Sequence, residues 1–473
     1  MIPLTLAEVA TATGGSLAEA DPATVVTGTV EFDSRAVSAG GLFVAFPGQR
    51  VDGHEFAEAA IAAGAAAVLA TRTVAGVPTV RVDDPHTAMG RLARAVLDRL
   101  PSLRVIGITG SSGKTTTKDL VAGLLGPLGP TVAPPGSFNN ELGLPYTVLR
   151  ADARTRFLVL EMGARGPGHL RYLCQIAPPS IGVVVNVGVS HLGEFGSVDA
   201  IAAAKGELPE ALPDEGTAIL NADDDRVRAM ASRTLARAVL AGESADAAVR
   251  AVGVRLDARG RAGYTLVGPG GSAPVQLRVA GRHQVGNSLL AAAVAIEAGM
   301  DLARIAGLLP TLRLASPRRM DVFDRSDGVT VIDDSYNANP ASTIAALRAL
   351  TGMSARRRAV AVLGYMAELG EHEHAGHADV GRVAARLGVD LVVVVGELAG
   401  PIHDGAVSES SWGGKSVQVT DQAAAVAVLR EELRPGDVVL VKGSRYRTWE
   451  VADALRADGP TAPAAPTTMG AGA

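Results

Sequence analysis

The chain has 473 residues, 47% hydrophobic and 20% charged, a balance that excludes large-scale disorder and, at roughly 100 to 200 residues per domain, suggests about three domains. Its 44 Lys and Arg against 49 Asp and Glu give a net charge of -5, and aromatic residues reach only 3%, which argues against a nucleic-acid-binding surface. The single cysteine, Cys174, excludes an intrachain disulfide and indicates a reducing compartment, and we expect it in the core.

The amino-terminal run "MIPLTLAEVA" lacks the basic start and apolar stretch of a signal peptide. No uncharged apolar run is long enough to span a bilayer. We therefore expect a cytoplasmic protein without a membrane partner. We also expect a monomer that does not bind nucleic acid.

Three series of elements follow one another along the chain. Residues 1–101 contain short apolar runs such as "GLFVAF" and "AAAVLA" among turns and small helices, which predicts a small α/β domain. In residues 102–316, strand-like runs such as "RFLVLEMG", "IGVVVNVG" and "GTAILNAD" alternate with helical ones, a pattern typical of βαβ units in a parallel sheet. A polar hinge, "LRLASPRRMDV", leads into residues 317–457, where "VTVIDDSY", "RAVAVLGYM", "DLVVVVGE" and "DVVLVKGS" predict a second parallel sheet. Residues 458–473 have too few large apolar side chains to pack, and we expect a disordered tail.

The stretch "GITGSSGKTTTKDL", which begins at Gly107, places glycines between a strand and a helix. At such a helix start the backbone N–H groups and the helix dipole can bind phosphate oxygens, Lys114 can add a charge and Thr115 can ligate Mg²⁺. Ile108 stands where the usual motif G-x-x-x-x-G-K-[ST] has glycine, and an ordinary glycine-rich turn is the alternative. We predict a nucleotide site made of Gly110, Ser111, Ser112, Gly113, Lys114, Thr115 and Thr116.

A metal site is predicted beside this loop. Glu161 closes the strand "FLVLE" and His191 follows "IGVVVN", and ligands of parallel sheets bind beyond the carboxyl ends of the strands. A carboxylate suits Mg²⁺, whereas a lone histidine is a weak ligand and more often a structural residue. Lys205 lies in the alanine-rich run "AIAAAKGEL", where a lysine is ordinarily solvated.

Taken together, these segments resemble those of the Mur ligases, ATP-dependent amide-forming enzymes of bacterial peptidoglycan synthesis. "TGSSGKTT" resembles the phosphate loop of the family, and "EMGARGPGHL", "NVGVSHLGEFGS" and "AKGEL" resemble its metal-binding segments. The likeness covers nearly the whole chain except the tail. It implies ATP and Mg²⁺ as cofactors and a carbamylated Lys205, whose modified side chain would act as a carboxylate-like ligand. The implied metal set is Thr115, Glu161, His191 and Lys205, and the implied catalytic set is Lys114, Lys205, His191 and Arg319.

The resemblance extends the nucleotide site to later segments. "GRHQVGNSLLAAAVA" is similar to the helix near the adenine, with His283 and Asn287 four apart on one face, although Asn287 could also be a helix cap. Arg319 in "SPRRMDV" matches an arginine that approaches the γ-phosphate, although it could equally be a solvated hinge residue. The third domain adds Asp334, Tyr336, Asn337 and Asn339.

Within the family, "DDSYNANPAS" and "FNNELGLPYTVL" resemble enzymes that add D-alanyl-D-alanine to UDP-N-acetylmuramoyl-tripeptide through an acyl phosphate. The alternatives are the preceding ligase, which adds a diamino acid, and a non-catalytic P-loop switch. The preceding ligase has an Asp-Asn-Pro-Arg loop, and no such run occurs here. "DSRAVSAGGLFVAFPGQRVDGHEF" resembles a uridine-nucleotide segment that both ligases share. The substrate-binding set is Ser34, Arg35, Asn139, Asn140, Lys442, Ser444 and Arg445, of which Lys442, Ser444 and Arg445 could instead form a structural turn.

Two features depart from expected patterns. Tyr365 in "LGYM" replaces an acid that is common in the family, so a role for that acid is in doubt here. "GEHEHAGH" lacks the spacing of two zinc-binding histidines, and we expect His372, His374 and His377 to lie at a solvated helix start. Together these observations predict an α/β fold of three domains: a small α/β UDP-substrate-binding domain (1–101), a central P-loop parallel-sheet ATPase domain (102–316) and a Rossmann-like carboxy-terminal ligase domain (317–457).

Overall fold

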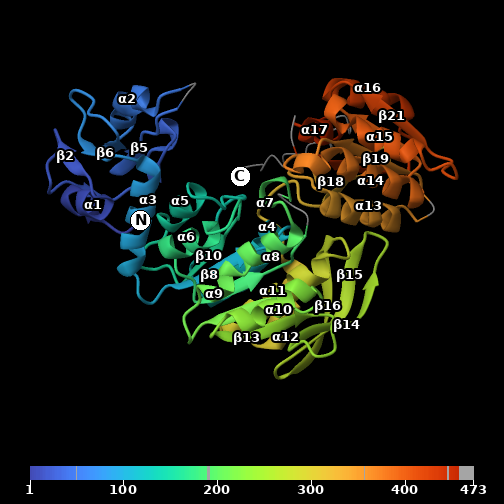
Figure 1. Ribbon diagram of the computed structural model, residues 1–473, viewed down its shortest axis with the longest axis horizontal. Helices are drawn as coiled ribbons and strands as arrows, with labels where there is room; N and C mark the ends of the chain where they lie inside the picture. The colour runs from blue at the N-terminus through green and yellow to red at the C-terminus, as the bar shows by residue number, and fades with distance from the viewer. Residues whose placement is uncertain (49–50, 189–191, 356, 445–446, 458–473) are drawn as a thin grey trace, which may run out of the picture.

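The computed structural model describes residues 1–48, 51–188, 192–355, 357–444 and 447–457. Three α/β domains follow one another in Figure 1, and the central domain connects the blue amino-terminal domain to the orange and red carboxy-terminal domain. This confirms the predicted fold class, whereas the exact domain limits stay predictions and the predicted tail lies outside the described residues. In the part of the chain that is described, no helix has the length and apolar character needed to cross a bilayer.

The amino-terminal domain contains a five-stranded sheet in the order β2-β7-β6-β5-β4. Its strands β4 to β7 pair in parallel, and β2 runs antiparallel to β7. The sheet strands are β2 (Ser16–Ala18), β4 (Val30–Glu31), β5 (Gly41–Val44), β6 (Ala65–Ala70) and β7 (Thr79–Arg81), with a separate pair β1 (Leu4–Thr5) and β3 (Val25–Val26). The helices are α1 (Leu6–Thr13), α2 (Ala57–Ala62) and α3 (Pro85–Asp98).

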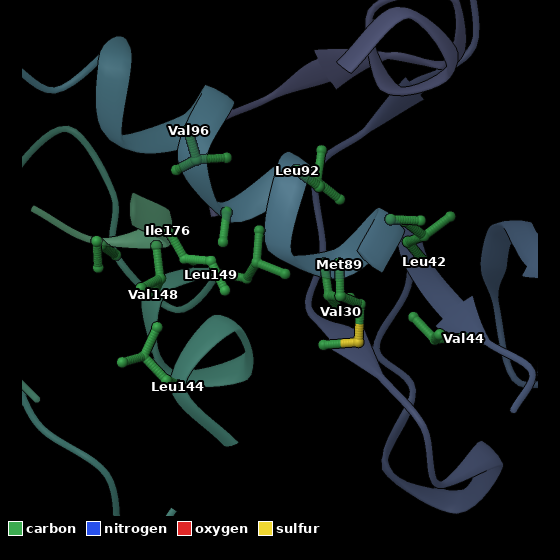
Figure 2. Close-up of a cluster of buried hydrophobic side chains, with 14 of the residues drawn as sticks. Val30, Leu42, Val44, Met89, Leu92, Val96, Leu144, Val148, Leu149 and Ile176 are labelled. Atoms are coloured by element: carbon green, nitrogen blue, oxygen red, sulfur yellow. The ribbon is translucent and has the colours of Figure 1, made fainter. Parts of the chain in front are cut away.

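Helix α3 joins the first two domains through one hydrophobic cluster. Asp84 caps its first turn and Pro85 opens it, as is common at a helix start. Its apolar residues recur three and four apart, so one stripe is buried. Figure 2 shows Met89, Leu92 and Val96 between side chains of the amino-terminal sheet and those of the central domain. The labelled neighbours are Val30, Leu42, Val44, Leu144, Val148, Leu149 and Ile176.

The central domain is built on a nine-stranded sheet in the order β16-β15-β14-β13-β12-β11-β8-β10-β9. Its strands are β8 (Arg104–Thr109), β9 (Thr131–Val132), β10 (Phe157–Glu161), β11 (Ile181–Val184), β12 (Thr217–Asn221), β13 (Arg237–Gly242), β14 (Val249–Leu256), β15 (Arg261–Gly268) and β16 (Gly271–Ala280). Its helices are α4 (Lys114–Leu125), α5 (Gly143–Val148), α6 (His169–Ile176), α7 (Leu192–Phe195), α8 (Val198–Lys205), α9 (Glu207–Glu210), α10 (Asp225–Ala229), α11 (Gln284–Glu297) and α12 (Leu302–Leu308). Cys174 is buried in α6, which confirms its predicted place in the core.

The predicted parallel pairing of the central sheet does not extend to β15 and β16. Strands β8 to β14 pair in parallel, but β14 with β15 and β15 with β16 are antiparallel hairpins. Each hairpin closes through a glycine at positive φ, Gly260 (67°) in one turn and Gly270 (91°) in the other. The connections are too short for the crossover helix that a parallel pair needs, so these strands fold back on their neighbours.

The carboxy-terminal domain has a six-stranded sheet in the order β17-β18-β22-β19-β20-β21. All pairs are parallel except the edge pair β17–β18, and the edge strands β17 and β21 lie outside the four predicted runs. The strands are β17 (Asp321–Asp324), β18 (Thr330–Asp333), β19 (Ala359–Gly364), β20 (Leu391–Val395), β21 (Lys415–Val419) and β22 (Val438–Lys442). Helices α13 (Pro340–Ser354), α14 (Glu373–Arg386) and α15 (Gly400–Val407) cover one face, and α16 (Gln422–Glu432) and α17 (Trp449–Ala457) cover the other. Helices on both faces of a mostly parallel sheet confirm the Rossmann-like prediction.

Candidate active site

A cavity of about 1150 Å³ is lined by both the central and the carboxy-terminal domain. Most of the predicted site residues line it: Ser111, Ser112, Gly113, Lys114, Thr115, Thr116, Asn139, Asn140, Glu161, His283, Asn287, Arg319, Asp334, Tyr336, Asn337, Asn339, Lys442 and Ser444. Gly110 and Lys205 are not among the lining residues, and Ser34 and Arg35 belong to the amino-terminal domain. His191 and Arg445 lie outside the described residues.

The phosphate loop connects β8 to α4, as predicted, and two of its glycines are required by the backbone. Gly110 has φ 156° and Gly113 has φ 81°, and a Cβ at Gly113 would lie 2.6 Å from Oδ1 of Asn287. The ammonium of Lys114 donates to the Gly110 carbonyl oxygen at 2.7 Å. The loop therefore curls tightly before the first turn of α4, where the N–H groups of a helix start face outward without helical partners.

Two loop amides differ from the predicted phosphate cradle. The N–H of Ser111 donates to the backbone oxygen of Asn186 at 3.0 Å, and the N–H of Ser112 donates to the Asn186 side chain at 2.9 Å. Asn186 follows β11 and was missed in the sequence, where its only sign is a polar residue directly after a buried run. These contacts leave the amides at the beginning of α4 as the donors suited to phosphate oxygens.

Glu161 lies at the end of β10 and is 1% exposed. Its carboxylate accepts hydrogen bonds from the Thr115 hydroxyl (2.8 Å), the Ser137 hydroxyl (2.7 Å) and the Asn139 amide (2.8 Å). Among the described residues no basic side chain forms an ion pair with Glu161. Because carboxylate and hydroxyl oxygens suit Mg²⁺, Thr115 and Glu161 fit a magnesium site.

Lys205 ends α8 and is 3% exposed, so the alternative of a solvated lysine is wrong. The helix turns Ile201, Ala204 and Lys205 inward together. Burial, and secondarily the charge of Lys114, lowers the pKa of Lys205 to about 7. Within the described chain its ammonium has no hydrogen-bond or ion-pair partner, and no three His, Cys, Asp or Glu side chains converge there on one point. Of the four residues predicted to hold a metal, Thr115, Glu161 and Lys205 are thus buried, and His191 lies outside the described residues.

The two residues predicted near the adenine lie at the start of α11. His283 precedes its first residue, and Asn287 is buried one turn later, where its amide donates to Oε1 of Gln284 at 2.8 Å. Because Asn287 lies inside the helix, the helix-cap alternative is wrong. The neighbouring Arg282 forms two hydrogen bonds with Glu243, and both residues line the cavity although the sequence analysis did not select them.

Arg319 reaches from the segment between the two domains to the phosphate loop. Its guanidinium donates to the Thr115 hydroxyl at 3.1 Å and lies 4.2 Å from the centre of the Tyr336 ring. Its Nε is buried and finds no hydrogen-bond partner in the part of the chain that the structure describes. A cation placed between the phosphate loop and an aromatic ring of the other domain is therefore not a solvated hinge residue.

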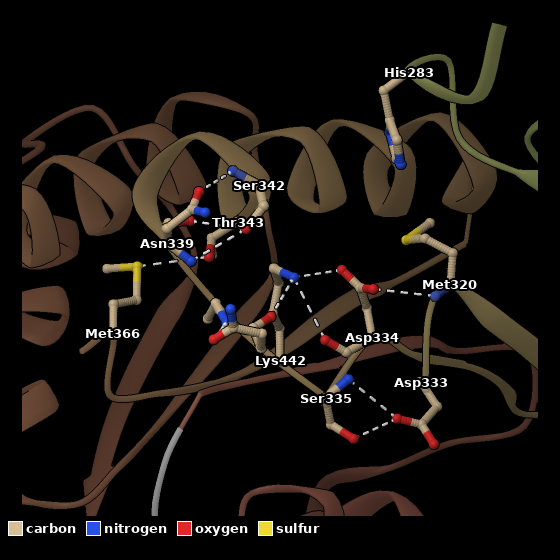
Figure 3. A network of polar contacts seen from close by, with 12 residues as sticks. His283, Met320, Asp333, Asp334, Ser335, Asn339, Ser342, Thr343, Met366 and Lys442 are labelled. Carbon is tan, nitrogen blue, oxygen red and sulfur yellow. Dashed lines mark hydrogen bonds and ion pairs between the residues drawn. The ribbon is translucent and has the colours of Figure 1, made fainter. Parts of the chain in front are cut away.

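Figure 3 shows the polar network at the ends of β18 and β22. Lys442 is 3% exposed, and its ammonium lies 2.5 Å from Oδ2 of Asp334. The ammonium also donates to the backbone oxygen of Asn337 at 3.0 Å. Oδ1 of Asp334 accepts the Met320 N–H at 3.1 Å. Asn339 caps α13 in a reciprocal pair with Ser342. This network favours the structural alternative for Lys442, since its protons are directed at Asp334 and the adjoining backbone.

Other predicted residues support the loop that follows β19. The Ser444 hydroxyl donates to the backbone oxygen of Tyr365 and accepts the Ala367 N–H, both at 3.0 Å. The Tyr365 hydroxyl lies 2.5 Å from Oε2 of Glu373, so an acid is present beside the tyrosine that replaces one. His377 is wholly buried, and its Nε2 accepts the Met366 N–H at 2.9 Å. The prediction of a solvated helix start therefore holds for His372 and His374 but is wrong for His377.

The substrate residues predicted nearer the amino terminus are divided between two places. Asn139 and Asn140 line the cavity: Asn139 contacts Glu161, and Oδ1 of Asn140 accepts the first amide of α5 at 2.9 Å. Ser34 and Arg35 form a turn in the amino-terminal domain, where Arg35 is exposed and paired with Asp33. The two residues predicted to bind the uridine nucleotide, Ser34 and Arg35, therefore lie in a different domain from the phosphate loop.

Comparison with known proteins gives matches along most of the chain. Family models match at residues 28–96 (Mur ligase family, catalytic domain), 108–295 (Mur ligase middle domain) and 318–445 (Mur ligase, glutamate ligase domain). The UDP-N-acetylmuramoyl-tripeptide--D-alanyl-D-alanine ligase of Mycobacterium tuberculosis H37Rv is 50% identical, over 97% of this chain and 98% of that protein. A crystal structure of MurF from Acinetobacter baumannii superposes with a TM-score of 0.85 at 30% identity, covering 96% of this chain and 99% of that one. MurF ligase from Thermotoga maritima in complex with ADP gives a TM-score of 0.78 at 30% identity, covering 91% and 98%.

Proposed function

The chain belongs to the Mur ligase family, and on that premise we propose that it joins D-alanyl-D-alanine to UDP-N-acetylmuramoyl-tripeptide in an ATP-dependent reaction. The product is the pentapeptide precursor of peptidoglycan. The observation that carries this function is the 50% identity, over 97% of the chain, to a ligase with those two substrates in its name. The cavity supports this function, because side chains suited to binding a nucleotide and a metal ion lie there beside residues of the carboxy-terminal domain.

In this function the nucleotide lies along the cavity from α4 to α11. The first amides of α4 and the ammonium of Lys114 bind the β- and γ-phosphates, and His283 and Asn287 lie toward the base. Mg²⁺, held by Thr115, Glu161 and a carbamylated Lys205, would offset phosphate charge in the transition state. Carbamylation suits Lys205 because its amine is buried and its pKa is lowered to about 7, and the neutral form of an amine reacts with CO₂.

The chemistry requires activation of a carboxylate, which as an anion resists attack by an amine. An oxygen of the terminal carboxylate of the tripeptide attacks the γ-phosphorus, the β–γ bridge breaks, and ADP leaves with the bridging oxygen. The amino group of D-alanyl-D-alanine then attacks the acyl carbon, loses a proton and expels phosphate, so that an amide bond remains. Arg319, already in contact with Thr115, stabilises the charge on the transferred phosphoryl group.

Substrate binding draws on all three domains. Ser34 and Arg35 take the uridine nucleotide, Asn139 and Asn140 lie near the peptide end at Glu161, and the loop containing Asp334, Tyr336 and Asn337 faces the nucleotide from the carboxy-terminal domain. Lys442 keeps this loop in place through Asp334. Residues at the boundary of two domains require those domains to close on the substrates, with the segment around Arg319 as the hinge.

The experiment is phosphate release from ATP by purified protein with each UDP-peptide and each acceptor, followed by mass spectrometry of the product. D-alanyl-D-alanine with the UDP-tripeptide should give release and the mass of the pentapeptide. Release with a diamino acid and a UDP-dipeptide instead would establish the preceding ligase. Nucleotide binding with no amide product from any acceptor would establish the switch module.

A further inference from the structure

Helix α4 carries a buried ion pair that the reaction as described does not use. The ammonium of Lys118 lies 2.6 Å from Oδ1 of Asp119, and the two side chains are 0% and 2% exposed. Buried ion pairs add little net stability, because the cost of removing both charges from water offsets their attraction, and apolar replacements are often as stable. The contacts of this pair indicate what else it does.

Asp119 holds the hinge on the phosphate-loop helix. Its Oδ2 accepts the Ser316 N–H at 2.9 Å, and its Oδ1 accepts the Ser316 hydroxyl at 3.3 Å. Asp119 lies one helical turn after Thr115, so the two side chains are on the same face of α4. Thr115 accepts from Arg319, three residues beyond Ser316. One face of α4 therefore contacts both Ser316 and Arg319.

The backbone around Arg319 needs such an anchor. Arg318 has φ 60° and Met320 has φ 54°, left-handed values that non-glycine residues hold only where surrounding contacts impose them. On the carboxy-terminal side, Asp334 accepts the Met320 N–H. On that side Arg318 also donates to Asp453 and to the backbone oxygen of Trp449. The segment that contains Arg319 is thus anchored in both domains, and Asp119 supplies the central-domain contact at Ser316.

Lys118 links helix α4 to the loop that contacts Glu161. Its ammonium donates to the backbone oxygens of Pro134 (2.6 Å) and Gly136 (3.4 Å) and to the Ser316 hydroxyl (3.1 Å). The next residue along that loop, Ser137, donates to Glu161. The ion pair therefore attaches both Ser316 and the loop at Pro134 and Gly136 to helix α4.

We propose that Asp119, with Lys118 as its counter-ion, is a positioning residue that holds Ser316 so that Arg319 reaches the transferred phosphoryl group. This inference rests on the proposed function, because it concerns the phosphoryl transfer of that reaction. Asp119 and Lys118 are not among the residues that line the cavity, and they act through the placement of Arg319. A displacement of about 1 Å in a group that contacts the reacting atoms can cost on the order of 10²-fold in rate.

The test is a double-mutant cycle of Asp119→Asn and Arg319→Ala, with kcat and the KM for ATP measured by phosphate release. Both carboxylate oxygens of Asp119 accept hydrogen bonds, so either orientation of an asparagine amide sets a donor against a donor. We expect Asp119→Asn to lower kcat by on the order of 10- to 10²-fold with little change in KM. In the Arg319→Ala background the same substitution should cause almost no further loss, because the group it positions is gone.

Independent losses that multiply in the double variant would overturn the proposal, as would an unchanged kcat in Asp119→Asn. If Asp119→Asn does not fold, Lys118→Met/Asp119→Leu leaves no unpaired charge, and a wild-type kcat in that variant would equally overturn it. Asp437→Asn is the matched control, since Asp437 is a buried acid paired with Arg358 away from the cavity, and it should keep wild-type kcat. Wild-type protein in the same assay separates the two hypotheses: no turnover there contradicts the proposed function, whereas multiplicative losses in an active enzyme contradict only this inference.

Discussion

Replacing Lys205 by methionine should stabilise the protein and abolish its activity. Lys205 is 3% exposed and has no hydrogen-bond or ion-pair partner among the described residues, and burial lowers its pKa from the ordinary 10.5 to about 7. The folded state therefore disfavours the charged amine, which the unfolded chain carries at neutral pH. Methionine has a similar length and no charge, so Lys205→Met removes this cost while it fills nearly the same space.

The size and sign of the effect follow from the two pKa values. Above pH 10.5 the amine is neutral in both states and costs nothing, below pH 7 it is charged in both and the full cost applies, and between them the unfolded chain binds more protons, so stability rises with pH. The advantage of Lys205→Met in free energy of unfolding should be on the order of 4 kcal/mol at pH 7.5 and on the order of 1 kcal/mol at pH 9.5.

Urea unfolding of both proteins over this pH range, in buffer free of CO₂ and divalent metal, measures the difference. A difference in free energy that does not change with pH, or a variant less stable than wild type at pH 7.5, would refute the account of a buried, unpaired amine. Lys415→Met is the control, because Lys415 is exposed and paired with Glu432, and it should not raise the free energy of unfolding.

The same pair of proteins tests the carbamate. Added bicarbonate should raise the turnover of CO₂-depleted wild type and leave Lys205→Met inactive, and carbon-13 NMR with labelled bicarbonate should show a carbamate signal in wild type alone. Small carboxylates such as acetate should restore part of the activity of Lys205→Ala. Full wild-type activity without CO₂, together with no carbamate signal, would assign Lys205 another role.

Three further substitutions test other parts of the site. Lys114→Ala should abolish turnover and weaken ATP binding in calorimetry, because its ammonium lies at the phosphate loop; full activity would contradict the nucleotide assignment. Glu161→Gln keeps the shape of the side chain but removes its charge, and kcat should fall by roughly 10²–10³-fold with a higher Mg²⁺ requirement, which a metal titration of the rate would detect. A Cβ at Gly370 would lie 2.6 Å from Cα of Gly193 in the central domain, so Gly370→Ala should slow turnover. It should also reduce the compaction that we expect small-angle scattering to detect when an ATP analogue and UDP-peptide are added. Gly388→Ala is the control, because Gly388 has φ 72° with open space around it, and it should change neither result.

Several parts of the site could be predicted because they depend on neighbours in the sequence. A buried run, a glycine turn and a helix with Lys114 and Thr115 at its start are local patterns, and β8 and α4 form there as expected. Glu161 could be placed for the same reason, since the end of an apolar run locates the end of a strand and parallel strands end on one edge. The family could likewise be recognised from short contiguous segments, of five to 24 residues.

Other features depend on contacts between distant segments, and only the tertiary structure decides them. The periodicity of α8 does not show that Lys205 faces the protein interior, because burial depends on what packs against a helix. Asn186 engages the phosphate loop across 74 residues, and Asp119 holds Ser316 across 197. The antiparallel pairing of β14 with β15 and of β15 with β16 depends both on the turns that join the strands and on the contacts between paired strands. Local propensity determines where strands and helices begin and end, whereas the pairing of buried polar groups depends on three-dimensional packing, since each such group must find its partner wherever the fold brings one within reach.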